Sequence, residues 1–400
     1  MEPESQLNLP AIQLDAPQPS GLATEAEAAQ QALAAFPLLA EATLPPETPV
    51  SGSFAWVFVG ANGLRTGWTV IIFFLLWRYL PQFFGTLFFL AHLIAPEPSY
   101  TATDSFFREL VLFISLLGAA ATAMLLQYRP RNLLAYNLIG PKRTRHFLVG
   151  MVAGFAALSL LVGALKAGGW IAIAPSGTAT PLLIQDAALW GLMFLLVSFY
   201  EEGTFRCYLQ AMLTRGLNLW WALGSEAAIC GWLLWRGKGN GIWGVLLIAL
   251  LGLGPCLWLA LRKAESAGFW LAAWVASTFF GQVHTGNGGE NWIGIFSAAA
   301  IGFVFAVSVR LTGSAWWAIG FHAAWDWAET YFYGTADSGM QTQGSLLISK
   351  PAGNLFWSGG TDGPEGSVLV LAVISITLGA LLLAYGRGPK ALEPEAQAQL

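Results

Sequence analysis

The sequence predicts an all-α, polytopic transmembrane helix bundle with a disordered N-terminal tail, and composition and apolar runs are the observations that predict it. The chain is 56% hydrophobic and only 10% charged, and its mean hydropathy is +0.58. Soluble domains are about 25% charged, so this composition indicates a membrane protein. A run of about 20 apolar residues can cross a bilayer, and the chain contains about ten such runs. They cover residues 68–94, 106–127, 147–166, 182–213, 219–235, 241–261, 267–284, 291–309, 314–333 and 366–386.

The uneven distribution of charge divides the chain into segments. Residues 1–64 contain seven acidic residues and no Lys or Arg, and they are rich in Ala, Gln and Pro. We therefore expect residues 1–60 to form a disordered, acidic cytoplasmic tail. The other expected segments are N-terminal transmembrane helices at 65–175, a helical core with ionisable groups at 180–335, an external loop at 336–365 and a C-terminal transmembrane helix at 366–388.

The basic residues of the short connections predict the orientation. The connection 128–146 contains the densest group of Lys and Arg, which indicates that it is cytoplasmic. Counting spans outward from it places the N-terminus inside, with Arg236 and Lys238 as the exceptions. Because no signal peptide pattern opens the sequence, we expect a multi-pass protein of a bacterial inner (plasma) membrane. The sequence has no basic tract of the kind that binds nucleic acid, so we expect no nucleic-acid partner. The lipid bilayer is an expected partner.

The first candidate site is the segment that contains Glu201, Glu202 and Arg206 within an apolar run. Ionisable side chains at membrane depth are costly and mark candidate functional sites. Glu202 and Arg206 are four residues apart, so they share a helix face in the order that favours an ion pair. Glu201 points about 100° away around the helix and is free for another role. The pattern fits either a structural Glu–Arg bridge or a carboxylate that acts as a general base.

Two further polar patches lie downstream on apolar runs. Phe280 and His284 are four residues apart at the end of one run, and His322 and Asp326 have the same spacing in another. Four-residue spacing places both side chains of a pair on one helix face. Each patch taken alone is ambiguous, because a histidine at a helix end or beside an aspartate can be purely structural.

The remaining histidines and the cysteines are not assigned to a site. His92 and His146 have no acidic neighbour at helical spacing. Cys207, Cys230 and Cys256 lie in or beside apolar runs and fit no zinc motif, so we expect buried thiols.

The order Glu-Glu-x-x-x-Arg, Phe-x-x-x-His and His-x-x-x-Asp resembles the CPBP intramembrane protease family, also called Abi. This family includes the type II CAAX prenyl endopeptidases and bacterial bacteriocin-processing or self-immunity proteins. The resemblance covers residues 182–333 and has two departures. The separation of Cys207 and His284 is 77 residues (284 − 207), which exceeds the family spacing by about a helical hairpin, so we expect an inserted hairpin at 219–261. Cys207 also stands where the family commonly has Gly.

The resemblance implies an endopeptidase with a polar site built from all three motifs. It assigns Glu201 to the activation of a water molecule, with His284 assisting. It assigns His322 and Asp326 to stabilising the oxyanion or completing the site, together with Glu202 and Arg206 of the first motif. An ionised Asp cannot donate a hydrogen bond, so Asp326 helps an oxyanion only if it is protonated, acts through water or orients His322.

The sequence alone does not decide the cofactor or the class of function. Glu201, His284, His322 and Asp326 form a valid zinc ligand set, whereas Glu and His alone could also act without a cofactor. The expected substrate is a membrane-associated peptide or protein. One alternative is a non-catalytic scaffold or self-immunity protein that keeps the fold, which the presence of every reacting group disfavours. A secondary transporter is the other, and the lack of an internal sequence repeat disfavours it.

Overall fold

The computed structural model describes residues 54–60, 63–127, 133–236, 250, 252–259, 261 and 267–386. The chain divides into two units, Met1–Asn62 and Gly63–Leu400. The first unit contains η1 (Phe54–Val57) and β1 (Val59–Gly60). The rest of the expected tail lies outside the described residues, as do residues 128–132 of the basic connection and most of the predicted run 241–261.

The second unit is mostly helical, which confirms the helical fold class. Its helices and strands, in chain order, are β2 (Gly63–Leu64), α3 (Thr66–Leu90), α4 (Ala102–Leu126), η2 (Leu133–Ala135), α5 (Arg143–Ala167), β3 (Ile171–Pro175), α6 (Thr180–Glu202), η3 (Gly203–Leu209), α7 (Gln210–Thr214), α8 (Leu219–Arg236), α10 (Ala267–His284), α11 (Trp292–Thr312), α12 (Trp316–Trp327), η4 (Ala328–Tyr333), β4 (Leu347–Pro351), α13 (Leu355–Ser358), η5 (Pro364–Gly366) and α14 (Leu369–Tyr385).

Five helices of the described residues are long and apolar enough to cross a membrane, so ten spans are not confirmed. They are α3, α4, α5, α11 and the continuous helix Thr180–Thr214 formed by α6, η3 and α7. The predicted run 314–333 contains α12 and the π-helix η4 that continues it, and α14 has 17 residues. None of these is among the five candidate spans of the described residues. An apolar run therefore predicts a buried helix here without deciding that it crosses the bilayer.

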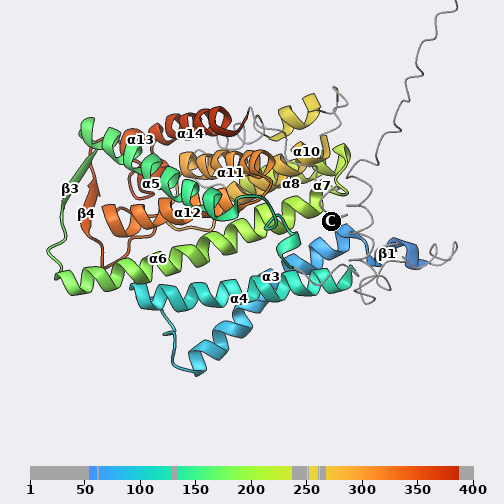
Figure 1. Ribbon diagram of the computed structural model, residues 1–400, viewed down its shortest axis with the longest axis horizontal. Helices are drawn as coiled ribbons and strands as arrows, with labels where there is room; N and C mark the ends of the chain where they lie inside the picture. Colours follow the sequence, from blue (N-terminus) through green and yellow to red (C-terminus); the bar gives the residue numbers. More distant parts are fainter. Residues whose placement is uncertain are drawn as a thin grey trace, which may run out of the picture. The chain divides into compact units, whose positions relative to one another are not determined.

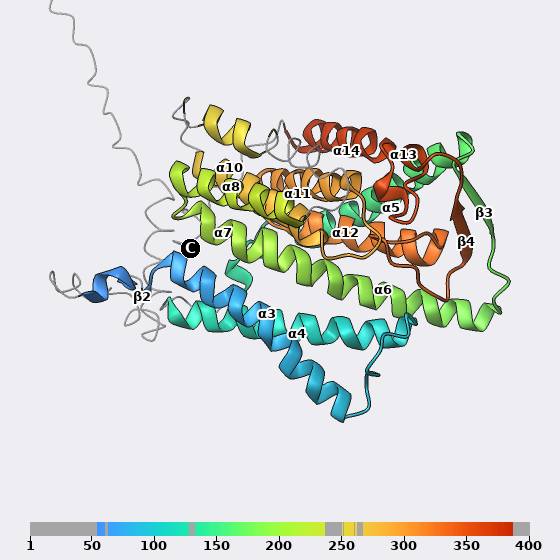
Figure 2. The same ribbon diagram turned by 180° about the vertical axis from the view of Figure 1, so that it is seen from behind.

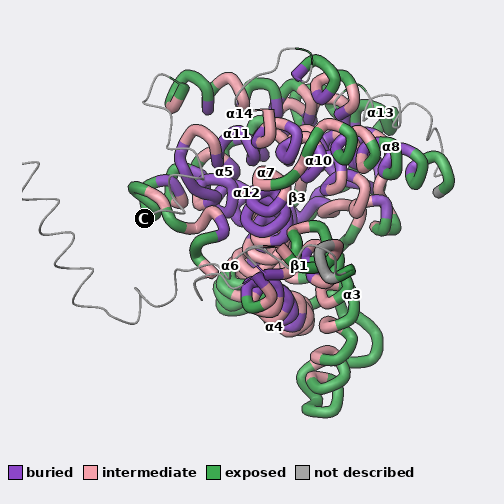
Figure 3. Tube along the Cα trace, turned by 90° about the vertical axis from the view of Figure 1, so that its right-hand side faces the viewer, coloured by how far each residue is buried: buried purple, intermediate pink, exposed green. Residues whose placement is uncertain are grey.

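The long helix α6 runs through the middle of the second unit. The pair α3 and α4 packs along one side of it, and α12 packs along the other (Figures 1 and 2). Beyond α12 lie α5, α11 and α14, which share the main apolar core around Leu158, Phe305 and Phe321. The tube view shows α12 as a mostly buried element, whereas the outer turns of α3 are exposed (Figure 3). The helix that carries His322 and Asp326 is thus enclosed by its neighbours.

Small residues bring the backbones of α5 and α12 together. A Cβ atom at Gly154 would collide with the carbonyl oxygen of Phe321, and one at Gly320 would collide with the carbonyl oxygen of Phe147. Glycines at such contacts allow two helices to approach closely within a membrane. This packing holds α12 in place from the side opposite the polar site.

The predicted external loop 336–365 contains regular structure. Strand β4 pairs antiparallel with β3, with Ile171 opposite Pro351 and Pro175 opposite Leu347 (Figure 1). The indole rings of Trp170 and Trp357 stack with their centroids 5.0 Å apart. These contacts fasten the connection between η4 and α14 to the end of the bundle.

Candidate active site

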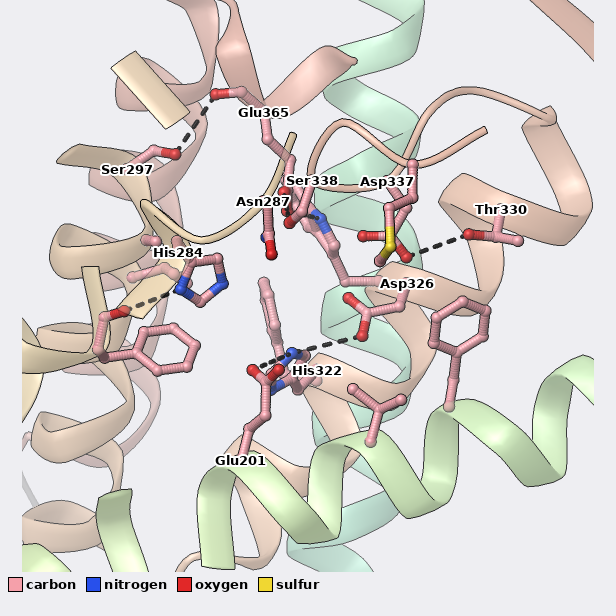
Figure 4. Close-up of a pocket in the computed structure, with 18 of the residues that line it drawn as sticks. Glu201, His284, Asn287, Ser297, His322, Asp326, Thr330, Asp337, Ser338 and Glu365 are labelled. Atoms are coloured by element: carbon pink, nitrogen blue, oxygen red, sulfur yellow. Dashed lines mark hydrogen bonds and ion pairs between the residues drawn. The ribbon is translucent and has the colours of Figure 1, made fainter. Parts of the chain in front are cut away.

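A cavity of about 310 Å³ lies between α4, α6, α10, α11, α12 and α14 (Figure 4). Four of the predicted site residues line it, namely Glu201, His284, His322 and Asp326. Glu202 and Arg206 do not line it and are buried. The bundle therefore brings the three motifs, which are far apart in the sequence, to one place.

The Glu202–Arg206 pair is a buried ion pair beside the cavity. Arg206 Nε lies 3.2 Å from Glu202 Oε2, and the two side chains are 1% and 0% exposed. The guanidinium also lies over the rings of Phe280 and Phe305, at 4.3 and 5.3 Å from their centroids. Cation–π contacts of this kind favour a desolvated guanidinium. The pair is thus enclosed by aromatic side chains from α10 and α11.

Helix α6 changes to a π-helix, η3, directly after Glu202. A π-helical turn alters the backbone hydrogen-bond pattern and is frequent at functional sites. The side chain of Asn137 donates a hydrogen bond to the carbonyl oxygen of Arg206 over 2.7 Å. This contact supports the backbone of the π-helical turn that contains Arg206.

His322 joins the first and third motifs. Its Nδ1 atom lies 2.9 Å from Glu202 Oε1, and its Nε2 atom lies 3.3 Å from Asp326 Oδ2 and 3.6 Å from Glu201 Oε2. The four-residue spacing predicted the His322–Asp326 contact. Glu201 and Glu202 contact different nitrogens of the same imidazole.

The contacts of His322 require a shared proton. Both ring nitrogens face carboxylate oxygens, and an ionised carboxylate can only accept a hydrogen bond. A neutral imidazole has a single N–H group, so it can donate to only one side. Either His322 carries both protons, or Asp326 or Glu201 carries the second. The cluster therefore holds a proton at Nε2 or on a carboxyl group that faces it.

His284 lies on the opposite side of the cavity from Glu201 (Figure 4). Its Nδ1 atom is 2.8 Å from the carbonyl oxygen of Phe280. A carbonyl only accepts, so Nδ1 is the protonated nitrogen and Nε2 is left as an acceptor. Within the described residues, no hydrogen bond or ion pair joins His284 to Glu201, His322 or Asp326. The space between them is the cavity itself.

The predicted zinc set does not gather into one ligand group. Among the described residues, one group of three ligating side chains has all its ligand atoms within 4.8 Å of one another, and it consists of Glu329, Asp337 and Glu365. None of the predicted zinc ligands belongs to it. These four residues thus do not fit a shared zinc site in this arrangement.

Several acidic residues that line the cavity were not predicted from the sequence. Glu109 of α4 lines it, and its position in an apolar run was a usable signal. Asp337 and Glu365 also line it but belong to the connection between η4 and α14. Burial, together with the charge of Glu365, raises the pKa of Asp337 to about 7. A polar connection offers no pattern that distinguishes such carboxylates from solvated ones.

The unassigned residues of the sequence analysis lie elsewhere. Neither His92 nor His146 is among the residues that line the cavity. Cys207, Cys230 and Cys256 are free and buried, which confirms the expected buried thiols. The described part of the predicted insertion, α8, packs on α10 through Glu226, whose carboxylate accepts a hydrogen bond from Thr278 over 2.7 Å.

Comparison with known proteins identifies a family that part of this chain resembles. A family model described as type II CAAX prenyl endopeptidase Rce1-like matches residues 255–328. The matched segment contains His284, His322 and Asp326, whereas Glu201 and Glu202 precede it. No curated protein and no solved structure gives a significant match. The family match confirms the resemblance of this chain to the CPBP family of CAAX-type proteases.

Proposed function

We propose that the protein is an intramembrane endopeptidase of the CAAX prenyl protease type that hydrolyses a peptide bond of a membrane-associated peptide or protein. The observation that carries this proposal is the unequal state of the two adjacent glutamates. Glu202 is fully buried and held by Arg206 and His322, whereas the Glu201 side chain is 26% exposed and lines the cavity. Of these two glutamates, Glu201 is the one placed to take a proton from water.

In the proposed reaction, Glu201 accepts a proton from water as the water oxygen attacks the scissile carbonyl carbon. His284 orients that water through its Nε2 acceptor from the other side of the cavity. The proton held between His322 and Asp326 passes to the leaving amine as the C–N bond breaks. The proton on Glu201 then returns to His322, whose Nε2 is 3.6 Å away. General acid–base steps of this kind each contribute about 10² to 10⁴ in rate.

Two features support this assignment of roles. The shared proton on the His322–Asp326 pair answers the chemical objection that an ionised Asp cannot assist a developing charge. The family match covers the helices that supply His284, His322 and Asp326. The proposal includes a bacterial inner membrane location with a cytoplasmic N-terminus, for which the basic connection 128–146 is the support.

The test is cleavage of a prenylated CAAX peptide by the purified full chain in detergent. We expect Glu201→Gln to reduce the rate by about 10² to 10⁴. Glu97→Gln is the matched control, because Glu97 is an exposed glutamate outside the cavity. Equal rates for wild type and Glu201→Gln would remove Glu201 as the base. If the wild type cleaves no prenylated or membrane-associated peptide, the scaffold or self-immunity alternative gains.

A further inference from the structure

A second group of carboxylates, formed by Glu329, Asp337 and Glu365, stands beside the catalytic cluster. Glu329 belongs to η4, Asp337 to the connection that follows it, and Glu365 to η5. One oxygen from each lies within 4.8 Å of the others. The two ends of the connection between η4 and α14 therefore lie close enough together for their carboxylates to bind one ion.

Glu329 is the member that requires an explanation. Its side chain is 0% exposed, and neither of its carboxylate oxygens has a hydrogen-bond partner in the described residues. Burying an ionised carboxylate without a partner costs several kcal/mol. The two free oxygens face a group of further acids and no counter-charge.

The other two carboxylates are held in fixed orientations. The indole N–H of Trp325 donates to Glu365 Oε1 over 2.8 Å, and the Ser338 hydroxyl donates to Glu365 Oε2 over 3.0 Å. The Thr330 hydroxyl donates to Asp337 Oδ2 over 3.1 Å. Donors that orient carboxylates in this way are typical of the outer shell of a metal site. No ion pair with Lys, Arg or His involves the three acids within the described residues.

We propose that Glu329, Asp337 and Glu365 bind a divalent cation of the calcium class, which holds the connection between η4 and α14 against the end of α12. The ligands are all oxygens, which calcium and magnesium prefer and zinc does not. Two ligand oxygens on opposite sides of a calcium ion are about 5 Å apart, so a group with separations of up to 4.8 Å can surround one ion. Magnesium needs shorter distances and binds more weakly at this spacing.

The position of the site gives the cation a defined effect. Asp337, Ser338 and Glu365 all line the catalytic cavity (Figure 4). Trp325, which bonds to Glu365, precedes Asp326 on α12. An ion at the three carboxylates would thus order the cavity wall opposite Glu201.

The test is direct binding to the purified full chain in detergent after treatment with a chelator. Terbium replaces calcium at oxygen sites, and Trp325 is placed to sensitise its luminescence. We expect terbium emission that calcium displaces, and a melting temperature that rises with calcium, with a dissociation constant between about 10⁻⁶ and 10⁻³ M. Absence of both signals up to about 10 mM calcium, above this range, would overturn the site.

Variants separate ligation from general charge. Glu329→Gln keeps the shape of the side chain and should weaken calcium binding at least about tenfold, as should Asp337→Asn if the first variant folds poorly. Glu290→Gln is the matched control, because Glu290 also has a carboxylate oxygen, Oε2, that is buried without a partner and lies outside the group. An equal loss in the control would overturn direct ligation. Binding is measured without substrate, so this result is independent of peptide cleavage.

Discussion

The two buried carboxylate groups of this protein differ in how their charge is balanced. Each includes a glutamate at a change from α-helix to π-helix, Glu202 before η3 and Glu329 within η4. In the first group, Glu202 forms ion pairs with Arg206 and His322. The second group has no ion pair with Lys, Arg or His among the described residues. The difference indicates that the first group is complete within the chain and that the second is built to receive a cation.

The largest expected effect follows from removing the internal cation of the first group. Arg206→Met leaves the buried Glu202 carboxylate with an unpaired charge, which should lower the free energy of unfolding by about 3 to 5 kcal/mol. Denaturant or thermal unfolding in detergent measures this. The double variant Glu202→Gln/Arg206→Met should recover most of the loss. A single variant as stable as wild type would show that Glu202 is not ionised in the fold.

The second prediction concerns chemistry rather than stability. His284→Gln replaces the basic imidazole, whose Nε2 atom faces the cavity, with a non-basic amide, and we expect a decrease of about 100-fold in kcat, or about 2.7 kcal/mol of activation free energy. Unfolding should change little, because the recorded hydrogen bond of His284 is to a backbone carbonyl of its own helix. His92→Gln, at an exposed histidine, is the control. Unchanged kcat in His284→Gln would remove this residue from the mechanism.

The third prediction is a difference in stability between Glu329→Gln and wild type, and its sign depends on whether calcium is bound. In a chelator, Glu329→Gln should be more stable than wild type by about 1 to 3 kcal/mol, because it removes a buried acid without a partner. With saturating calcium the order should invert, since only the wild type gains binding free energy. Thermal unfolding under both conditions tests this. The same order in both would mean that the second group needs no cation.

The last prediction concerns the pH dependence of stability, at an acid that belongs to neither group. Burial is the main cause that raises the pKa of Asp362 to about 8, with smaller contributions from the charges of Glu365 and Asp337, against a hydrogen bond from the Asn291 N–H. A raised pKa in the fold means that the stabilisation is complete below about pH 4, the value of a free Asp, and is lost as the pH rises through 8.

Asp362→Asn should therefore reduce the decline in stability between pH 4 and pH 8, by at most about 1.4 kcal/mol per pH unit. Unfolding is measured across that range in a chelator, so that cation binding does not contribute. Parallel pH profiles for the variant and wild type would contradict the prediction.

The predictable parts of the site are the local ones. Four-residue spacing was sufficient to place Glu202 against Arg206 and His322 against Asp326, because helix geometry alone decides these contacts. The contact of His322 with Glu202 spans 120 residues, and only the packing of α12 on α6 produces it. The ten predicted spans are not confirmed for a related reason, since an apolar run such as 314–333 suits both a core helix and a membrane span.

The sequence by itself determined the helical class, the apolar character of the bundle and the three motifs that supply the proposed reacting groups. These depend on composition and on periodicity within single helices. Only the tertiary structure decided that Glu201 faces the cavity while Glu202 is buried, and that Glu329, Asp337 and Glu365 meet. Contacts between distant elements depend on how helices and connections pack, and no local pattern contains that information.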